Sequence, residues 1–158
     1  MSTLAIGTYI RLLLQDGTPT AYAWQNFHQG TSRTHKGNGY DYAGFAYSGG
    51  SIDLESASIT ATIAMGLSQL SLNVFKEAAD NRYLMEVDSV WLDPDNNLSE
   101  TANYSSDIYT VLGWDHDGSR ISVALGSPLL AVGAQTHRRL TPALVGSLPP
   151  NGTIRIAG

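Results

Sequence analysis

The chain has 158 residues, with nine Lys and Arg against fourteen Asp and Glu, and no cysteine. This length suits one domain that can bury its own core without cross-links, and the lack of thiols excludes disulfides, thiolate metal sites and cysteine nucleophiles. The net charge of −5 argues against a nucleic-acid partner, because phosphate binding needs a basic surface.

The N-terminal residues 1–17 predict a strand rather than a targeting or membrane segment. They lack a basic start, and Gly7, Thr8 and Arg11 interrupt the apolar run. Neither a signal peptide nor a spanning helix has such a pattern. We therefore expect no membrane partner.

The first half of the chain predicts short strands. Tyr9–Leu14 and Ala21–Trp24 flank Asp16-Gly17, and an Asp-Gly pair supplies the turn residues of a β-hairpin. Ser58–Ile63 alternates apolar residues with hydroxyl residues, which is the period of a half-buried strand.

One segment predicts a helix, Leu70–Ala79. Leu70, Val74 and Ala78 recur at four-residue spacing, and Asp80 follows them. Residues four apart lie on one face of a helix, and a polar residue after the run is typical of a helix end.

The second half returns to strands. Tyr83–Leu92 is a partly alternating run, and Ile108–Trp114 and Ser119–Leu125 flank the turn signal Asp117-Gly118. Turn signals of this kind recur about every ten residues, which favours many short strands. The sequence therefore predicts a single all-β domain over residues 1–158, a β-barrel or β-sandwich with one short helix and an extended C-terminal arm.

Two acidic segments resemble chemical sites but are better explained as loops. His116 lies between Asp115 and Asp117, a grouping that a metal site or a small hydrolase could use, yet Asp-rich tips are common in hairpins. Asp93–Glu100 has alternating oxygen ligands, but a calcium loop needs glycine at the sixth position, where Leu98 stands.

No catalytic group stands out. There is no Gly-x-Ser-x-Gly elbow, and the four histidines are expected in polar, turn-rich surroundings. They are His28, His35, His116 and His137. We therefore expect no catalytic residue, no metal and no cofactor, and predict that the protein is not an enzyme.

One aromatic segment favours an alternative function. The stretch 39–50 carries rings that could stack on sugar faces, as in a carbohydrate-binding β-sandwich for host attachment. The competing interpretation places these rings in the core, where strand aromatics commonly lie. The rings are Tyr40, Tyr42, Phe45 and Tyr47.

The C-terminal arm, residues 127–158, has no clean strand or helix period after Pro128. Such an arm is expected to pack either on its own domain or on another subunit, where Arg138 and Arg139 would pair with carboxylates. The predicted interface residues are Leu129, Leu130, Val132, Arg138, Arg139, Leu140 and Leu144.

The order of these features resembles a known family. Gly39-Tyr40, the strand Ser58–Ile63, the helix, Tyr83–Leu92 and the tract from Leu125 to Arg139 follow one another as in the N-terminal β-rich domain of minor tail protein L of lambda-like siphophages. The family's protein has a cysteine-bearing C-terminal region associated with an iron–sulfur cluster. This chain has no cysteine, so no cluster is carried over.

The resemblance implies a structural role in the virion. It implies a baseplate-hub component at the tail tip that joins the end of the tail tube to the central spike or fibre. It also implies a ring of three or six copies, neighbouring tail proteins as partners, and synthesis in the host cytoplasm.

Overall fold

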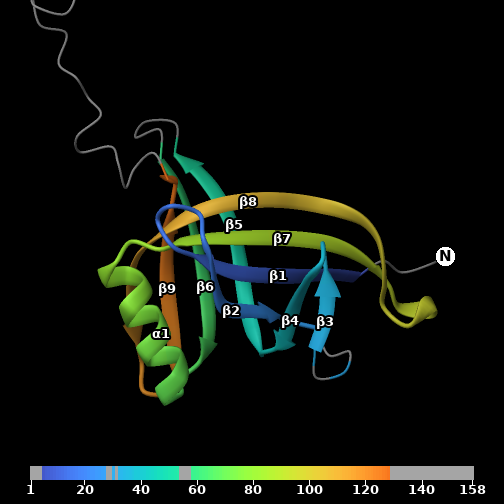
Figure 1. Ribbon diagram of the computed structural model, residues 1–158, viewed down its shortest axis with the longest axis horizontal. Coiled ribbons are helices and arrows are strands. Elements are labelled where there is room, and N and C mark those ends of the chain that lie inside the picture. The colour runs from blue at the N-terminus through green and yellow to red at the C-terminus, as the bar shows by residue number, and fades with distance from the viewer. Residues whose placement is uncertain (1–4, 28–29, 31, 54–57, 129–158) are drawn as a thin grey trace, which may run out of the picture.

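The computed structural model describes residues 5–27, 30, 32–53 and 58–128. It contains one continuous sheet of nine strands in the order β3-β4-β2-β1-β7-β8-β9-β6-β5, together with one α-helix (Figure 1). The prediction of an all-β fold with one short helix is confirmed. The elements are β1 Ala5–Leu13, β2 Pro19–Gln25, β3 Ser32–His35, β4 Asn38–Tyr42, β5 Phe45–Asp53, β6 Ser58–Gly66, α1 Gln69–Asp80, β7 Leu84–Asp93, the 3-10 turn η1 Pro94–Asn96, β8 Ser99–His116 and β9 Arg120–Gly126.

Both predicted hairpins form around their Asp-Gly turns. β1 pairs antiparallel with β2, and Gly17 has φ +85°, a conformation that glycine adopts without steric cost. β8 pairs antiparallel with β9, and in their turn the Asp117 carboxylate accepts hydrogen bonds from the backbone of Ser119 and Arg120 at 3.1 and 2.9 Å.

Strands β1, β7 and β8 form a central ribbon, with β7 in the middle, that runs across β5, β6 and β9 in Figure 1. Side chains alternate between its two faces, as in any strand. Ile10 and Val87 point to one face and belong to the larger core, whereas Tyr9 and Val90 point to the other and belong to a smaller one.

The larger core lies between the ribbon, strands β5, β6 and β9, and the helix. Its fully buried members include Phe75, Ile63 and Val123. The helix begins with a capping box, in which Ser68 and Ser71 each bond the backbone of the other, so two unpaired N–H groups of the first turn are satisfied.

The helix prediction is confirmed, with one difference in its buried face. Val74 and Ala78 are buried as expected, but Leu70 is largely exposed, and Ser71 and Phe75 complete the buried stripe. Leu70 lies in the first turn, where the helix only begins to approach the core. The stripe therefore starts one residue later than the sequence indicated.

The hairpin of β3 and β4 covers the second face of the ribbon. Tyr40 of β4 packs on Tyr9 with ring centroids 4.9 Å apart, while only two residue pairs join β4 to β2 in the sheet. Side-chain contacts across the ribbon therefore contribute much of what holds this hairpin in place.

Candidate functional site

The four predicted sugar-binding aromatics do not share one surface. Tyr40 and Phe45 are buried, in the smaller and the larger core respectively. Tyr47 is partly buried, and its hydroxyl lies 2.8 Å from that of Tyr109. Only Tyr42 is well exposed, at 43 %. The segment therefore supplies one accessible ring rather than a platform.

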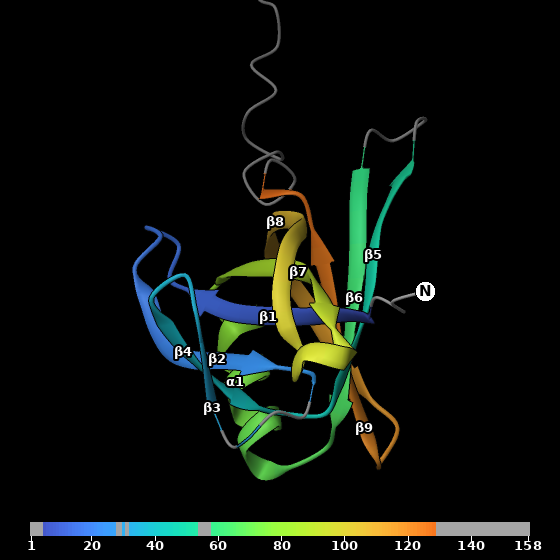
Figure 2. The same ribbon diagram turned by 90° about the vertical axis from the view of Figure 1, so that its right-hand side faces the viewer.

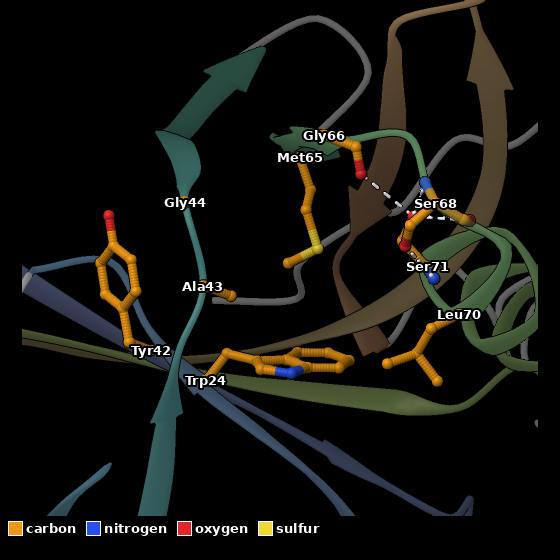
Figure 3. A pocket seen from close by; sticks show the side chains of 9 residues that line it. All are labelled: Trp24, Tyr42, Ala43, Gly44, Met65, Gly66, Ser68, Leu70 and Ser71. Atoms are coloured by element: carbon orange, nitrogen blue, oxygen red, sulfur yellow. Dashed lines mark hydrogen bonds between the residues drawn. The ribbon is translucent and has the colours of Figure 1, made fainter. Parts of the chain in front are cut away.

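Tyr42 lines a pocket of about 300 Å³ together with Trp24, Met65 and Leu70 (Figure 3). The pocket's two serines are the capping pair of the helix described above. The Ser71 hydroxyl also lies 3.1 Å from the carbonyl oxygen of Gly66, to which it can donate. These hydroxyls are thus already engaged by the helix N-terminus, and the rest of the lining is mainly apolar.

A buried charged cluster lies between the β3–β4 hairpin and the ribbon. His35 of β3 is 3 % exposed, with Nε2 3.1 Å from Asp88 of β7 and Nδ1 2.9 Å from Glu100 of β8. Each ring nitrogen of this buried histidine therefore lies within hydrogen-bond distance of a carboxylate.

His35 has polar neighbours and ends β3 beside the turn at Lys36 and Gly37, but its ring is buried. Its ring stacks on Tyr9 with centroids 4.2 Å apart. His116 is exposed at the end of β8 and stacks on Trp114. His28 and His137 lie outside the described residues.

The two carboxylates of the cluster have further donors. Asp88 accepts hydrogen bonds from Lys36 Nζ at 2.9 Å and from the Ser106 hydroxyl. Burial alone would raise the pKa of Asp88, but the hydrogen bonds from Ser106, Lys36 and His35 outweigh it and hold that pKa below its usual value.

Glu100 is held by a second set of partners. It accepts a hydrogen bond from the Tyr9 hydroxyl, and Arg33 Nε lies 3.7 Å away. Burial first, and then the hydrogen bond to Glu100, raises the pKa of Tyr9. Arg33 also donates to the carbonyl of Leu98 at 2.8 Å, so the cluster ties β3 to β1, β7 and the segment before β8.

The cluster brings a serine, a histidine and an aspartate together, but not as a catalytic triad. In a triad the serine donates to the histidine, which the aspartate orients. Here the Ser106 hydroxyl donates to Asp88 instead. Within the described ranges no group of three or more His, Asp or Glu could hold a metal. This arrangement joins strands and does not activate a nucleophile.

The opposite face of the ribbon ends in exposed apolar side chains. Tyr104 and Ile6 are 59 % and 49 % exposed here, whereas Ile108, which is 50 % exposed, pairs with Glu86 and lies on the same face as Ser106. Trp91 pairs in register with Ile6 and contacts Tyr104 edge-on, with ring centroids 5.2 Å apart. Figure 2 turns this end of the ribbon toward the viewer.

A hollow of about 350 Å³ opens beside these side chains. Ile6 and Tyr104 line it together with Tyr47, Ser89 and Asp107. Strand β5 contributes Tyr47, so the hollow lies where the covering strands stop short of the ribbon's end. It combines apolar rings with one carboxylate.

Strand β8 also has an open edge here. Residues 99–110 pair with β7 on one side, and β9 pairs with the other side only from Thr110 to His116. In the described part of the chain no strand pairs with the second edge of Ser99–Tyr109. We call Ser99–Ile108 the open edge.

Sequence reasoning directed attention to the C-terminal arm and missed the open edge. All seven predicted interface residues, from Leu129 to Leu144, lie outside the described residues. The available signal was the placement of Tyr104 and Ile108 in an otherwise polar run. Their exposure follows only from the pairing of β8. The sequence predicted this strand from Ile108 onward and did not indicate its first part, which begins at Ser99.

The comparisons with known proteins show no family for this chain. No protein-family model and no curated protein matches the chain, so the resemblance to minor tail protein L stays a prediction. No helix in the described residues is long and apolar enough to cross a membrane.

Two solved structures of a PdpA–VgrG complex, the first of them from Francisella, are similar to the chain. The half-lidded form is 11 % identical with a TM-score of 0.40, covering 85 % of this chain and 19 % of that one. The lidless form is 12 % identical with a TM-score of 0.39, covering 82 % and 20 %. The chain therefore spans about a fifth of the chains it matches, and likeness at this level identifies no function.

Proposed function

We propose that the protein is a structural component of a phage tail tip, a baseplate-hub subunit that joins the end of the tail tube to the central spike or fibre. It acts by protein–protein contacts and has no enzymatic activity. It assembles with itself as a ring of three or six copies and with neighbouring tail proteins, in a virion built in the host cytoplasm.

The observation that carries this proposal is the open edge. An exposed strand edge is a template for another strand, because its N–H and C=O groups have no partner in the sheet. Apolar side chains beside such an edge add the burial that stabilises a contact. A domain with this surface is suited to assembly more than to catalysis.

The hydrogen bonds within the buried cluster support the same proposal. Its carboxylates and imidazole are bonded to one another and to Ser106, Lys36 and Tyr9. They therefore serve to fix the β3–β4 hairpin on the ribbon. A domain with a firmly held hairpin and an unpaired strand edge is suited to be a structural subunit.

Deletion of Leu140–Gly158 tests the proposal. We expect the truncated chain to keep the far-ultraviolet circular dichroism and the cooperative unfolding of the full chain but to lose assembly. Light scattering would measure the mass of both chains, alone and mixed with the tail proteins encoded beside them. A full chain that stays monomeric in every mixture would contradict the proposal.

Carbohydrate binding for host attachment is the second candidate function. The pocket with Trp24 and Tyr42 favours it, since two aromatic rings line an open hollow. The engaged serines weigh against it, because sugar hydroxyls need free polar partners. Specific binding on a glycan array that is lost in Tyr42→Ala would support this function over assembly.

A further inference from the structure

We infer that the open edge of β8 receives residues 129–158 of a neighbouring copy as an added strand. This inference rests on the proposed self-association and names the two surfaces that meet. Five observations carry it: the backbone of the edge, the side chains on it, the charge of the two parts, the composition of residues 129–158, and the position where β9 ends.

The backbone of the open edge is long enough to hold a strand. Ten residues of β8 extend for roughly 33 Å. Register irregularities near Thr101 and Tyr104 divide this length, but Ser105–Thr110 pairs with β7 without a break. The segment Ser99–Ile108 contains no Lys or Pro, the residues that most often protect an edge from pairing. Hydrogen bonds are therefore expected along Ser105–Ile108.

The side chains provide the apolar part of the contact. Two of the five large apolar residues that are exposed in the described chain lie on the open edge, namely Tyr104 and Ile108. Tyr104 stands at a register irregularity, where a bulge re-aims a side chain. A partner strand would cover these side chains with its own alternating apolar residues, which is how strand addition gains specificity.

The charges of the two parts are complementary. Residues 1–128 contain six Lys and Arg and fourteen Asp and Glu, a net charge of −8, whereas residues 129–158 contain three Arg and no acid, a net charge of +3. Together they give the −5 of the whole chain. Asp107 lines the hollow beside the edge, so an incoming Arg would find a carboxylate there.

Residues 129–158 have the composition that such an edge needs. Leu129, Leu130, Val132, Leu140 and Leu144 supply apolar side chains, and Thr153–Ile156 alternates Ile with Thr and Arg, the period of a strand. Thirty residues reach at most about 100 Å when extended. This is ample to cross to an adjacent copy.

The end of β9 favours a neighbouring copy over the same chain. β9 stops at Gly126, opposite Thr110, next to the Ile108 end of the open edge. Pro128 follows, and it has no N–H with which to continue the ladder. The ladder therefore ends at Gly126, and among the described residues between 5 and 128 no strand covers the edge where pairing would continue. A head-to-tail contact of this kind closes a ring when the rotation between copies permits it.

Engineered disulfides test the inference directly, because the natural chain has no cysteine. One full-length copy carries Asn103→Cys at the open edge. A second copy with a different tag carries Thr153→Cys or Gln135→Cys. We expect mild oxidation of the mixture to join the two tagged copies covalently. The matched control replaces Asn103→Cys by Lys76→Cys on the exposed face of α1, and should give no joined product.

The same cysteines distinguish the source of the strand. If a chain that carries both Asn103→Cys and Thr153→Cys forms only an internal disulfide and remains a monomer, the strand comes from its own chain and the inference is wrong. Absence of joined copies with both tail cysteines also overturns it.

A charge substitution separates this inference from the proposed function. Tyr104→Lys removes a ring and adds a repelling charge, so we expect the concentration for half-assembly to rise at least tenfold. Tyr42→Lys, at the other exposed tyrosine, should leave it unchanged. If Tyr104→Lys assembles normally while deletion of residues 129–158 abolishes assembly, the proposed function is supported but this docking surface is wrong. If the unmodified chain never assembles, both fall.

Discussion

The two faces of the central ribbon differ in an unusual way, because charged side chains are buried on one face and apolar side chains are exposed at the end of the other. On one face, Asp88 and His35 are buried and fully bonded to partners. At the end of the other, Tyr104 and Ile6 remain largely in water. Buried charges are costly unless every group is paired, and exposed apolar groups commonly mark a contact surface. The difference separates what holds this fold from what it offers to partners.

The largest loss of unfolding free energy should come from Asp88→Ala. This change leaves His35 without the carboxylate that pairs with its Nε2 in a buried site, and breaking one partner of a buried pair costs about 3–5 kcal/mol of unfolding free energy. Urea unfolding followed by circular dichroism measures it. A loss below about 1 kcal/mol would mean that the cluster behaves as a surface ion pair and does not fix the β3–β4 hairpin.

A second effect should follow from Gly7→Ala in β1. A Cβ at this position would lie 2.5 Å from Phe27 and 2.6 Å from Leu92, so the second face must shift, and overpacking costs about 1–3 kcal/mol. Gly44→Ala is the control, because nothing lies within 4 Å of its added Cβ. Equal midpoints for the two variants in urea would show that the second face is not tightly packed.

Acid should weaken the second face selectively. The pKa of Asp88 is lower in the folded protein than its usual value, so its stabilising contribution is complete above about pH 4 and is lost as the pH falls through the folded pKa. Asp88→Asn removes this titration. We expect the unfolding free energy of Asp88→Asn to fall less steeply below pH 4 than that of the unmodified chain. Parallel slopes would show that Asp88 does not titrate as described.

The smallest effect on folding should come from Tyr104→Lys. Tyr104 is 59 % exposed, and its ring contact with Trp91 contributes about 0.5–1.5 kcal/mol, so the variant should unfold at only a slightly lower urea concentration than the unmodified chain. Its effect belongs to assembly alone. A loss of several kcal/mol would place Tyr104 in the fold instead of in the contact surface.

Local signals predicted the elements that depend on neighbouring residues. The turns at Asp16-Gly17 and Asp117-Gly118 and the helix over Gln69–Asp80 are each set by a few adjacent positions. Strands β3 and β4 escaped notice because their hairpin is short and polar. Its turn consists of Lys36 and Gly37, both with positive φ. From the sequence alone, this stretch is predicted only as a glycine-rich loop.

The buried cluster could not be predicted in the same way. His35 lies 53 residues from Asp88 and 65 from Glu100, and only the folding of the sheet brings the three together. The open edge has the same origin, since it exists because β8 continues past the end of β9. Both features depend on register between distant strands, about which a single sequence holds little information.

The most direct test of the account is the mass of the full chain in solution, measured by light scattering over a range of concentrations, alone and with its neighbouring tail proteins. We expect a species of three or six copies that disappears when residues 129–158 are removed, while the remaining domain stays folded. A monomer at every concentration, with and without those proteins, would contradict it.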